Sequence, residues 1–373
     1  MTARLRIVIA PDSFKGTATA ADAAAALAAG WHAARPGDDV VLAPMADGGE
    51  GTIGTIAAAV PGARRMPERV QGPIGRGNDG LVDAEWLLLP GTSPGDGPTG
   101  VVELAAASGI THLERLAPMA AHTHGFGQLI ARALAGGVHR LLLAIGGSAS
   151  IDGGTGALSA LGARFLDGTG EAVAPGGAGL GDIVLADLSA LPPLPAGGAV
   201  VLGDVTNPLF GEKGAAAVFG PQKGATPAQV AELDAGLRRL SGLVPADPGT
   251  SGAGAAGGTG FALLAWGASM TPGAVAIADA IGLANSIRSA DVVITGEGRF
   301  DDQSSDGKVP SHVLALADEG GAAAMLVAGR IDADTHGFAA SVSLTDLAGG
   351  TDAALADPLE WLRAAGTRLA NGL

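Results

Sequence analysis

The chain begins with two strand–loop–helix units in direct succession. An apolar, β-branched run over 5–10 (LRIVIA) indicates a strand, and an alanine-rich segment over 20–34, with Thr19 as its N-cap, indicates a helix. A second short strand over 40–43 leads through the loop PMADGGEG into a helical segment over 52–60. Two consecutive βα units predict a parallel, doubly wound sheet, which is an α/β fold.

The two ends of the chain look alike, and the middle differs from both. Order weakens between about 64 and 99, where Gly, Pro, Asp and isolated Arg dominate around the strand-like run EWLLL. The βα alternation returns near the C-terminus, with the strands DVVIT and AAAMLVA, a helix from Pro310 and a last helix over 353–369. At roughly 150 residues per domain, 373 residues suggest two domains. We predict that both ends share one sheet and that the middle is inserted: 1–65 plus 286–373, and 66–285.

The inserted segment is also expected to be α/β. Its helix over 226–240 opens with Thr226 as N-cap and Pro227 at the first helical position. The glycine-rich stretch over 249–260 is too short for a linker, and we interpret it as a site formed by backbone groups. The other expected strands and helices lie at 101–104, 126–134, 141–145, 157–161 and 199–205.

Charge and composition exclude several classes of partner and chemistry. Lys and Arg number 22 against 37 Asp and Glu, which gives a formal charge of −15. Nucleic acids and anionic membranes require a basic face. The absence of Cys excludes disulfides, thiolate zinc sites and a Cys nucleophile. No apolar run reaches the ~18 residues of a membrane span or forms a signal peptide. We expect a cytoplasmic protein that binds small molecules, with no nucleic-acid or membrane partner.

All four lysines of the chain stand next to a glycine. They are Lys15 (FKG), Lys213 (EKG), Lys223 (QKG) and Lys308 (DGK). Composition alone gives this result in about 1% of cases. A lysine beside a flexible backbone can reach phosphate oxygens that N–H groups already hold. The alternative is that Lys and Gly both favour exposed turns.

Carboxylates show a second pattern, because several predicted strands run directly into acidic loops. In an open α/β sheet, ligands bind at the carboxyl ends of the strands, where such loops can converge on one cleft. Asp residues there can hold Mg²⁺ or take a proton from a substrate hydroxyl. The alternative is that Asp and Gly are ordinary turn formers. The loops are APDSFKG, PMADGGEG, IGGSASIDGG, GDVTNPL and TGEGRFDDQ.

The sequence does not match several well-known functional motifs. The residues around Lys308 do not form a Walker A motif, and the GxGxxG at 252–257 has no strand before it. His122 and His124 have no carboxylate nearby in sequence, and the serines lack the GxSxG elbow of a hydrolase. Lysines, glycine loops and carboxylates remain, a combination more typical of phosphoryl transfer than of hydrolysis or hydride transfer.

At these loops the sequence resembles the bacterial glycerate kinase family, which includes the glycerate 2-kinases. The similarity runs in order from about Ile7 to Lys308 and more weakly beyond. The resemblance implies a Rossmann-like domain built from both chain ends, an inserted second α/β domain and an active site in the cleft between them. It also implies transfer of the ATP γ-phosphate to D-glycerate with Mg²⁺. The motifs are APDSFKG, PMADGGEGT, GGSASIDGG, DVTNPLFGEKGAAAVFGPQKGA, GAGAAGGTG and TGEGRFDDQSSDGK.

On this resemblance, residues of the loops receive roles. We expect Lys15 and Lys223 to neutralise phosphate oxygens, and Asp47 or Asp204 to accept the substrate proton. Arg299 is expected to pair with the glycerate carboxylate. Further substrate-binding residues are Asp12, Ser13 and Asn207. The expected nucleotide-binding residues are Gly146, Gly147, Ser148, Asp152, Gly257, Gly258 and Lys308, and the expected metal ligands are Glu297 and Asp301, with Asp12 as a further carboxylate.

The sequence departs from the family pattern at four positions: Ile151 in place of Asn, Gly203 in place of Cys, and His124 and Phe126 in place of Tyr and Thr. The loss of Asn removes a polar contact expected at the third loop. Two other functions stay open from the residues: a non-catalytic glycerate or nucleotide sensor, and a kinase for another hydroxy acid. The sequence does not distinguish the C2 from the C3 hydroxyl as acceptor, and it does not indicate the oligomeric state.

Overall fold

The computed structural model describes residues 4–14, 16–75, 80–91, 96–302 and 308–373. Contacts divide the chain into two compact units. The first unit comprises Met1–Asp47, Gly54–Pro61 and Pro272–Leu373, and the second comprises Gly48–Ile53 and Gly62–Thr271. Each unit is built on its own sheet, and both sheets contain parallel strands.

The first unit contains a five-stranded parallel sheet in the order β13-β12-β11-β1-β2. Strand β1 from the N-terminal part pairs directly with β11 from the C-terminal part, with Ile9 opposite Ile294. The prediction that both chain ends share one sheet is therefore confirmed. The strands are β1 (Arg6–Pro11), β2 (Asp39–Leu42), β11 (Val292–Phe300), β12 (Ala323–Ile331) and β13 (Ala340–Ser343).

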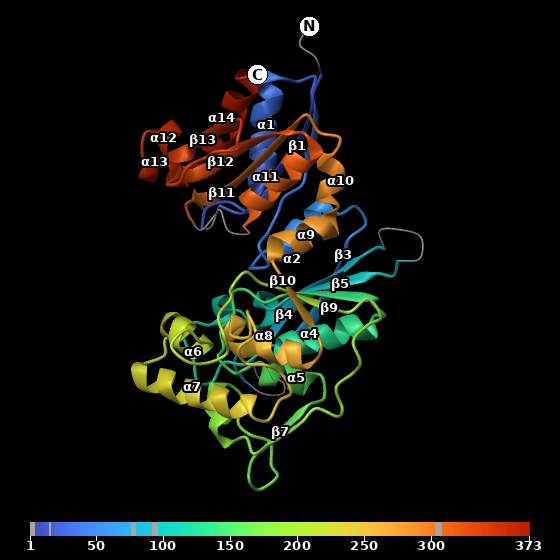
Figure 1. The fold of residues 1–373 in the computed structure, drawn as a ribbon, viewed down its shortest axis with the longest axis vertical. Helices are drawn as coiled ribbons and strands as arrows, with labels where there is room; N and C mark the ends of the chain where they lie inside the picture. The colour runs from blue at the N-terminus through green and yellow to red at the C-terminus, as the bar shows by residue number, and fades with distance from the viewer. Residues whose placement is uncertain (1–3, 15, 76–79, 92–95, 303–307) are drawn as a thin grey trace. The chain divides into compact units, whose positions relative to one another are not determined.

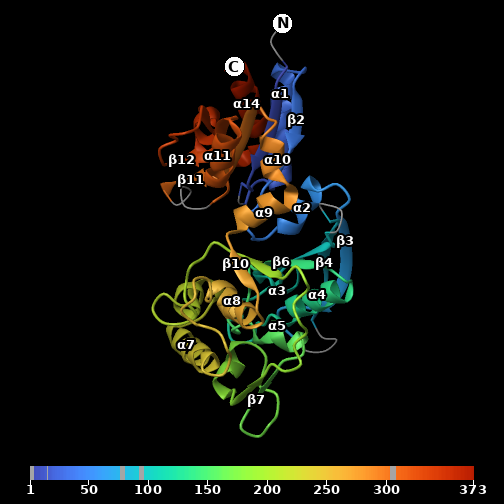
Figure 2. The same cartoon turned by 45° about the vertical axis from the view of Figure 1, so that its right-hand side comes forward.

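Helices bury both faces of this sheet. Side chains alternate along β1, so Ile7 and Ile9 enter the core formed with α1 and α14, while Val8 is equally inaccessible on the other face. Helices α1 and α14 run side by side in Figures 1 and 2. The helices of this unit are α1 (Ala20–Ala34), α9 (Gly273–Ile281), α10 (Leu283–Ile287), α11 (Val309–Gly320), α12 (Leu344–Ala348), α13 (Thr351–Ala356) and α14 (Pro358–Asn371), together with most of α2 (Thr52–Ala59).

The second unit has a six-stranded mixed sheet in the order β10-β9-β6-β5-β4-β3. Four strands are parallel, and β3 and β4 continue the sheet antiparallel. The strands are β3 (Arg64–Gln71), β4 (Leu81–Leu89), β5 (Thr99–Glu103), β6 (Arg140–Ala144), β9 (Ala199–Leu202) and β10 (Ser269–Thr271), and β7 (Arg164–Leu166) pairs separately with β8 (Leu185–Asp187).

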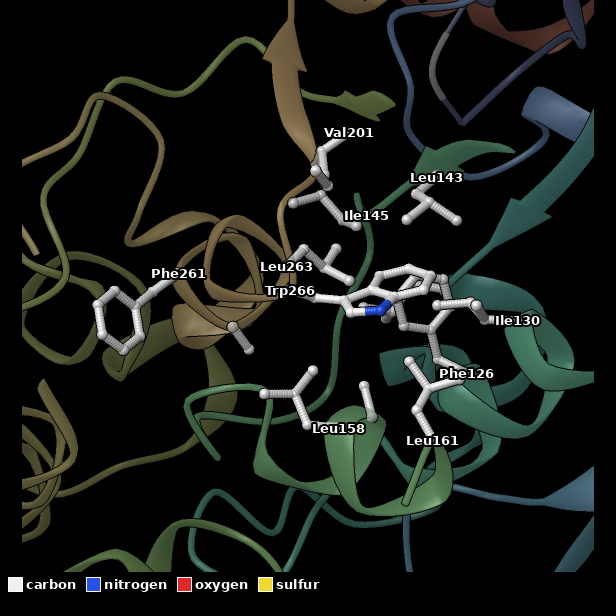
Figure 3. Packing of buried hydrophobic residues seen from close by; sticks show 14 of the residues in the cluster. Phe126, Ile130, Leu143, Ile145, Leu158, Leu161, Val201, Phe261, Leu263 and Trp266 are labelled. Carbon is white, nitrogen blue, oxygen red and sulfur yellow. The ribbon is translucent and has the colours of Figure 1, made fainter. Parts of the chain in front are cut away.

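Helices complete the core of the second unit. Figure 3 shows Phe126 and Ile130 from α4 gathered with Leu143 from β6 and Trp266, which follows α8. The α-helices are α3 (Ala105–Ser108), α4 (His124–Ala135), α5 (Thr155–Ala160), α6 (Ala215–Phe219), α7 (Pro227–Ser241) and α8 (Ala255–Ala265). The 3-10 turns are η1 (Ile110–His112), η2 (Gly177–Asp182) and η3 (Pro221–Lys223). Within the described ranges, no helix is both long and apolar enough to cross a membrane.

Three segments differ from the sequence-based expectation. The weakly ordered region after residue 64 contains β3, a charged edge strand whose alternation is hidden by Arg and Glu side chains. The expected last helix is two helices, because Pro358 begins α14 after Asp357 has left the helical conformation. The glycine-rich stretch runs into α8, where Ala256, Gly257 and Gly258 have positive φ and interrupt the helical backbone.

The close approach of α1 to α14 depends on Gly30. A Cβ at this position would overlap the backbone carbonyl of Arg363, whereas a Cβ at Gly37 would meet no atom within 4 Å. We predict that Gly30→Ala lowers the unfolding free energy of the first unit by about 1–3 kcal/mol, since the helices must move apart. Urea unfolding followed by circular dichroism measures this loss, with Gly37→Ala as the matched control. Equal stability of the two variants would contradict the packing described.

Candidate active site

Two of the acidic loops lie side by side at the carboxyl end of the first unit's sheet. Asp12 follows β1, and its backbone N–H donates to the carbonyl of Gly296 at 2.8 Å. This bond places Asp12 next to Glu297 on β11, and both side chains are buried. Ser13 continues the loop and donates its backbone N–H to the Asp12 carboxylate at 2.6 Å. Lys15 lies outside the described residues.

Beyond these carboxylates, β11 and β12 carry a pair of arginines in register, Arg299 opposite Arg330. Asp332 bridges them, with 2.8 Å to Arg299 Nε and 2.6 Å to Arg330 Nε. Asp301 lies 3.5 Å from Arg299. Arg299 is predicted from the sequence, whereas Arg330 and Asp332 become its neighbours only through the strand pairing. The arrangement keeps two guanidinium groups at one edge of the sheet.

Lys308 stands immediately before α11, and its carbonyl accepts the hydroxyl of Ser311 at 2.9 Å. Because α11 follows β11, Lys308 lies on the same connection as the arginine and carboxylate residues of that strand. The predicted residues Glu297 and Arg299 thus lie in the last part of β11, and Asp12, Ser13, Asp301 and Lys308 follow β1 or β11.

The carboxylates of this unit can supply only part of the ligands that a Mg²⁺ ion needs. Across the described ranges, no three His, Asp or Glu side chains are grouped closely enough to hold a metal ion. Glu297 and Asp301 are four residues apart along an extended chain, about 13 Å at 3.3 Å per residue. Mg²⁺ is commonly bound by one or two carboxylates plus substrate phosphates and water. Buried Asp12 and Glu297 fit that donor set, with phosphate oxygens supplying the remaining ligands.

In the second unit, two glycine loops pack against each other. Gly146 and Gly147 follow β6, and the N–H of Gly146 donates to the carbonyl of Gly48 at 3.2 Å. A Cβ on Gly146 would lie 2.6 Å from the Cα of Gly49, and one on Gly48 would lie 2.8 Å from the Cβ of Leu202. Side chains are excluded at both positions. The loop over 48–51 therefore lies across the carboxyl ends of β6 and β9.

Glu103, a residue that the sequence analysis did not select, holds this loop in place. It ends β5, is 6% exposed, and accepts the backbone N–H groups of Gly51 at 2.9 Å and Ile53 at 3.0 Å. Burial raises the pKa of Glu103, and the two N–H donors offset part of that effect. The signal that could have revealed it is a strand ending in a carboxylate, the same pattern as in the five acidic loops.

Lys223 is buried behind the loop that follows β6. Its side-chain nitrogen donates to Ser148 Oγ at 2.6 Å and to the carbonyl of Ser150 at 2.7 Å. Only 3% of the residue is exposed. Burial lowers the pKa of Lys223 to about 7, although the charge of Asp152 acts in the opposite direction. The side chain of Lys223 is thus directed into the loop that follows β6.

Asp152 fixes the same loop from within. Its carboxylate is inaccessible to solvent and accepts five hydrogen bonds. The donors are the N–H and hydroxyl of Thr123, both at 2.8 Å, the hydroxyl of Ser150 at 3.1 Å, and the N–H groups of Gly154 and Gly156, both at 3.2 Å. Such a set satisfies a buried carboxylate and makes the loop rigid.

The remaining candidates of this unit adjoin the loop or follow the neighbouring strand. The carbonyl of Gly257 accepts the N–H of Gly153 at 3.0 Å, and a Cβ on Gly257 would overlap the carbonyl of Ser150. Gly258 leaves no room for a Cβ either, which would lie 2.8 Å from the Cα of Gly153. Asp204 and Asn207 follow β9, and the amide of Asn207 donates to the carbonyl of Lys213 at 2.8 Å.

Two of the four departures from the pattern implied by the resemblance are buried apolar side chains, and His124 is half-buried. Ile151 and Phe126 are fully buried in the apolar core of the second unit. Burial lowers the pKa of His124, which His122 lowers further. Gly203 has space around it, with the nearest atom to a Cβ at 3.9 Å. The loop after β6 therefore has a buried aliphatic side chain at Ile151, where the resemblance implies an amide.

A hollow of about 740 Å³ in the second unit is unsuited to phosphate. Five of its lining residues are carboxylates, among them Glu50 and Glu103, against one arginine, Arg69, so the lining is net negative and disfavours anions. We therefore do not place the nucleotide there. The lining is completed by Pro67, Glu68, Arg69, Asp83, Ala84, Glu85, Ala105, Ala106, Thr111 and His112.

Comparison with known proteins agrees with the motifs. Residues 7–373 match the Glycerate kinase family. The chain belongs to this family. Glycerate kinase from Halalkalibacterium halodurans is 41% identical over 353 residues, 91% of this chain and 90% of that protein. Glycerate 2-kinase from Escherichia coli is 38% identical over 364 residues, 94% of this chain and 93% of that protein.

A solved structure shares the fold. A crystal structure from Salmonella typhimurium LT2, described under the name glycerate kinase 2, matches with a TM-score of 0.85 and 38% sequence identity. The match covers 99% of this chain and 98% of that chain. The relatives named glycerate kinase are phosphotransferases. This chain shares the fold of the solved structure, a mixed α/β architecture with parallel strands.

The Asp152 network leads to a prediction about stability. In Asp152→Asn one acceptor oxygen becomes a donor that faces N–H and hydroxyl donors, and Lys223 loses its counter-charge. We expect the second unit to lose about 3 kcal/mol or more of unfolding free energy. Urea unfolding measures this loss. Asp182→Asn, at an exposed position of the same unit, should change stability by less than about 0.5 kcal/mol. A similarly small effect at Asp152 would contradict the network.

Glu103 leads to a prediction about pH. Because the pKa of Glu103 is raised in the folded protein, its protonated carboxyl contributes most to the unfolding free energy at pH values below the ordinary pKa of 4.5. That contribution is lost as pH rises through the higher folded value. The unfolding free energy of wild type minus that of Glu103→Gln should therefore fall between pH 5 and 8. Urea unfolding across this range tests the sign, with Glu114→Gln as an exposed control. A difference that grows with pH would show that the carboxylate is stabilised rather than penalised by its site.

Proposed function

We propose that this protein transfers the γ-phosphate of ATP to the C2 hydroxyl of D-glycerate, with Mg²⁺, giving ADP and 2-phosphoglycerate. Family membership supports the reaction class, and the relative from Escherichia coli named glycerate 2-kinase supports the position. The observation that carries the proposal is the rigid glycine loop after β6 with a lysine buried behind it. In a chain of charge −15, such a local positive charge favours an anionic ligand.

The nucleotide is assigned to the loops of the second unit. Backbone N–H groups at Gly146 and Gly147 and the hydroxyl of Ser148 would hold phosphate oxygens. Asp152 would keep the loop in shape rather than contact the nucleotide, because its carboxylate already accepts five hydrogen bonds from protein groups. Gly257 and Gly258 would support the same loop from the start of α8. Lys308, on the connection after β11, would contribute a charge to the phosphates.

Glycerate is assigned to polar residues at the carboxyl ends of the strands or just after them. Arg299 would hold the carboxylate through guanidinium N–H groups, and Asp12, Ser13 and Asn207 would hold the hydroxyls. Asp47 or Asp204 would accept the proton of the C2 hydroxyl as its oxygen attacks the γ-phosphorus and the bond to ADP breaks. Lys15 would neutralise the charge of the transferred group.

Glu297 and Asp12 would hold Mg²⁺, whereas Asp301 lies 3.5 Å from Arg299 and would keep that guanidinium group in place. The ion would neutralise phosphate charge during transfer. Because ATP is the proposed donor, we also propose a cytoplasmic location.

³¹P NMR of the purified protein with MgATP and D-glycerate tests the reaction and its position together. We expect a 2-phosphoglycerate signal, and none above background with L-glycerate or without acceptor. A 3-phosphoglycerate signal would support the kinase activity but show that the phosphate is transferred to the C3 hydroxyl. Hydrolysis of ATP with no phosphorylated glycerate would overturn glycerate as substrate, and other hydroxy acids would be tested next. Binding of glycerate or nucleotide without any turnover would support a sensor.

Lys15 gives the sharpest test of the charge argument. Lys15→Ala should lower kcat/KM about 10²- to 10⁴-fold, the usual effect of removing one group that stabilises transition-state charge. Lys213→Ala, at an exposed lysine beside glycine that has no assigned role, is the matched control and should stay near wild type. A folded Lys15→Ala variant with activity within a few-fold of wild type would remove Lys15 from the mechanism.

A further inference from the structure

The contact between Lys223 and Ser148 has a defined polarity. An ammonium group has donors and no acceptor, so the 2.6 Å bond requires Ser148 Oγ to accept. A second N–H of Lys223 is directed to the carbonyl of Ser150 at 2.7 Å. The hydrogen of the Ser148 hydroxyl must then point away from Lys223. Within the described part of the chain, no acceptor is recorded for that hydrogen.

We propose that Lys223 is a positioning residue that acts through Ser148. It holds Ser148 Oγ so that the hydroxyl hydrogen is presented to a phosphate oxygen of the bound nucleotide. The inference rests on the proposed function and changes the role expected of Lys223 there, from direct contact with the transferred phosphate to orientation of the group that makes the contact.

Burial favours this role over a direct one. Lys223 is 3% exposed, and two of its three donors are used inside the loop. Ser148, by contrast, directly follows Gly147, which is exposed at the turn of the loop. Ser148 itself retains 7% exposure. The serine, not the lysine, is next to the accessible backbone of the turn.

Deprotonation of Lys223 would reverse the bond. A neutral amine has a lone pair and can accept, so the Ser148 hydrogen would turn inward and be lost to the ligand. The charged group that faces Lys223 is Asp152, and Asp152 in turn faces His124. Helix α6, which packs against the turn carrying Lys223, has the sequence AAAVF and no titratable side chain. The pKa near 7 places this reversal within an accessible pH range.

A double-mutant cycle on MgATP binding tests the inference. Isothermal titration calorimetry at pH 6.5 would give the Kd of wild type, Ser148→Ala, Lys223→Met and the double variant, with Ser241→Ala and Lys213→Met as controls outside the site. Each single substitution in the site should weaken binding roughly 10- to 100-fold, the range for a hydrogen bond to a charged group. If Lys223 acts through Ser148, the double variant should bind no more weakly than the weaker single variant. Additive losses would overturn the inference.

The pH dependence gives a second test that does not need a Lys223 variant to fold. In wild type, MgATP affinity should fall as pH rises from 6 to 9. In Ser148→Ala the affinity should fall less with pH, because the variant lacks the hydroxyl whose hydrogen turns toward Lys223. Any change that remains would come from titration of ATP itself. An equal decline in both proteins would overturn the inference while leaving the kinase intact. If wild type neither binds MgATP nor phosphorylates glycerate, the proposed function fails first and the inference with it.

Discussion

The parallel pairing of β1 with β11 is the contact on which the first unit depends. It joins segments about 285 residues apart in sequence, as the hydroxyl of Thr295 bonded to the carbonyl of Ala10 illustrates. Without this pairing, Asp12 and Glu297 would not meet at one edge of the sheet. The arginine pair Arg299 and Arg330 comes from the neighbouring pairing of β11 with β12. Because β11 takes part in both pairings, the carboxylates and the cations of this unit lie at the carboxyl ends of adjacent strands.

In the second unit, buried polar groups hold the loops of the candidate site in place. Asp152, Lys223 and Glu103 are almost inaccessible, and each holds a loop by bonds to backbone or hydroxyl groups. Close glycine contacts do the rest, because Gly48 and Gly146 leave no room for side chains. Glycine therefore serves here to bring loops together, as well as to permit turns.

The sequence predicted the helices and strands whose patterns are local and strong. The βα order at both ends and the caps at Thr19 and Thr226 are confirmed. Strand β3 was missed because, as an edge strand, it carries charges on its exposed side. Family motifs located most candidate residues, but Glu103 and Asp332 depend on contacts between distant segments. The direction of Lys223 was also beyond the sequence, since only packing shows that its charge is buried.

The way the two units share the chain affects the order of folding during synthesis. Most of the second unit is the continuous stretch Gly62–Thr271, so its sheet can form once that stretch has been made. Strands β1 and β2 are synthesised earlier but must wait for β11, which begins only at Val292. Until then one edge of β1 has no partner, and its apolar residues Ile7 and Ile9 lack most of their final neighbours. Strand β1 is therefore synthesised well before its native partner β11, and its unpaired edge can associate with other chains until β11 has been made.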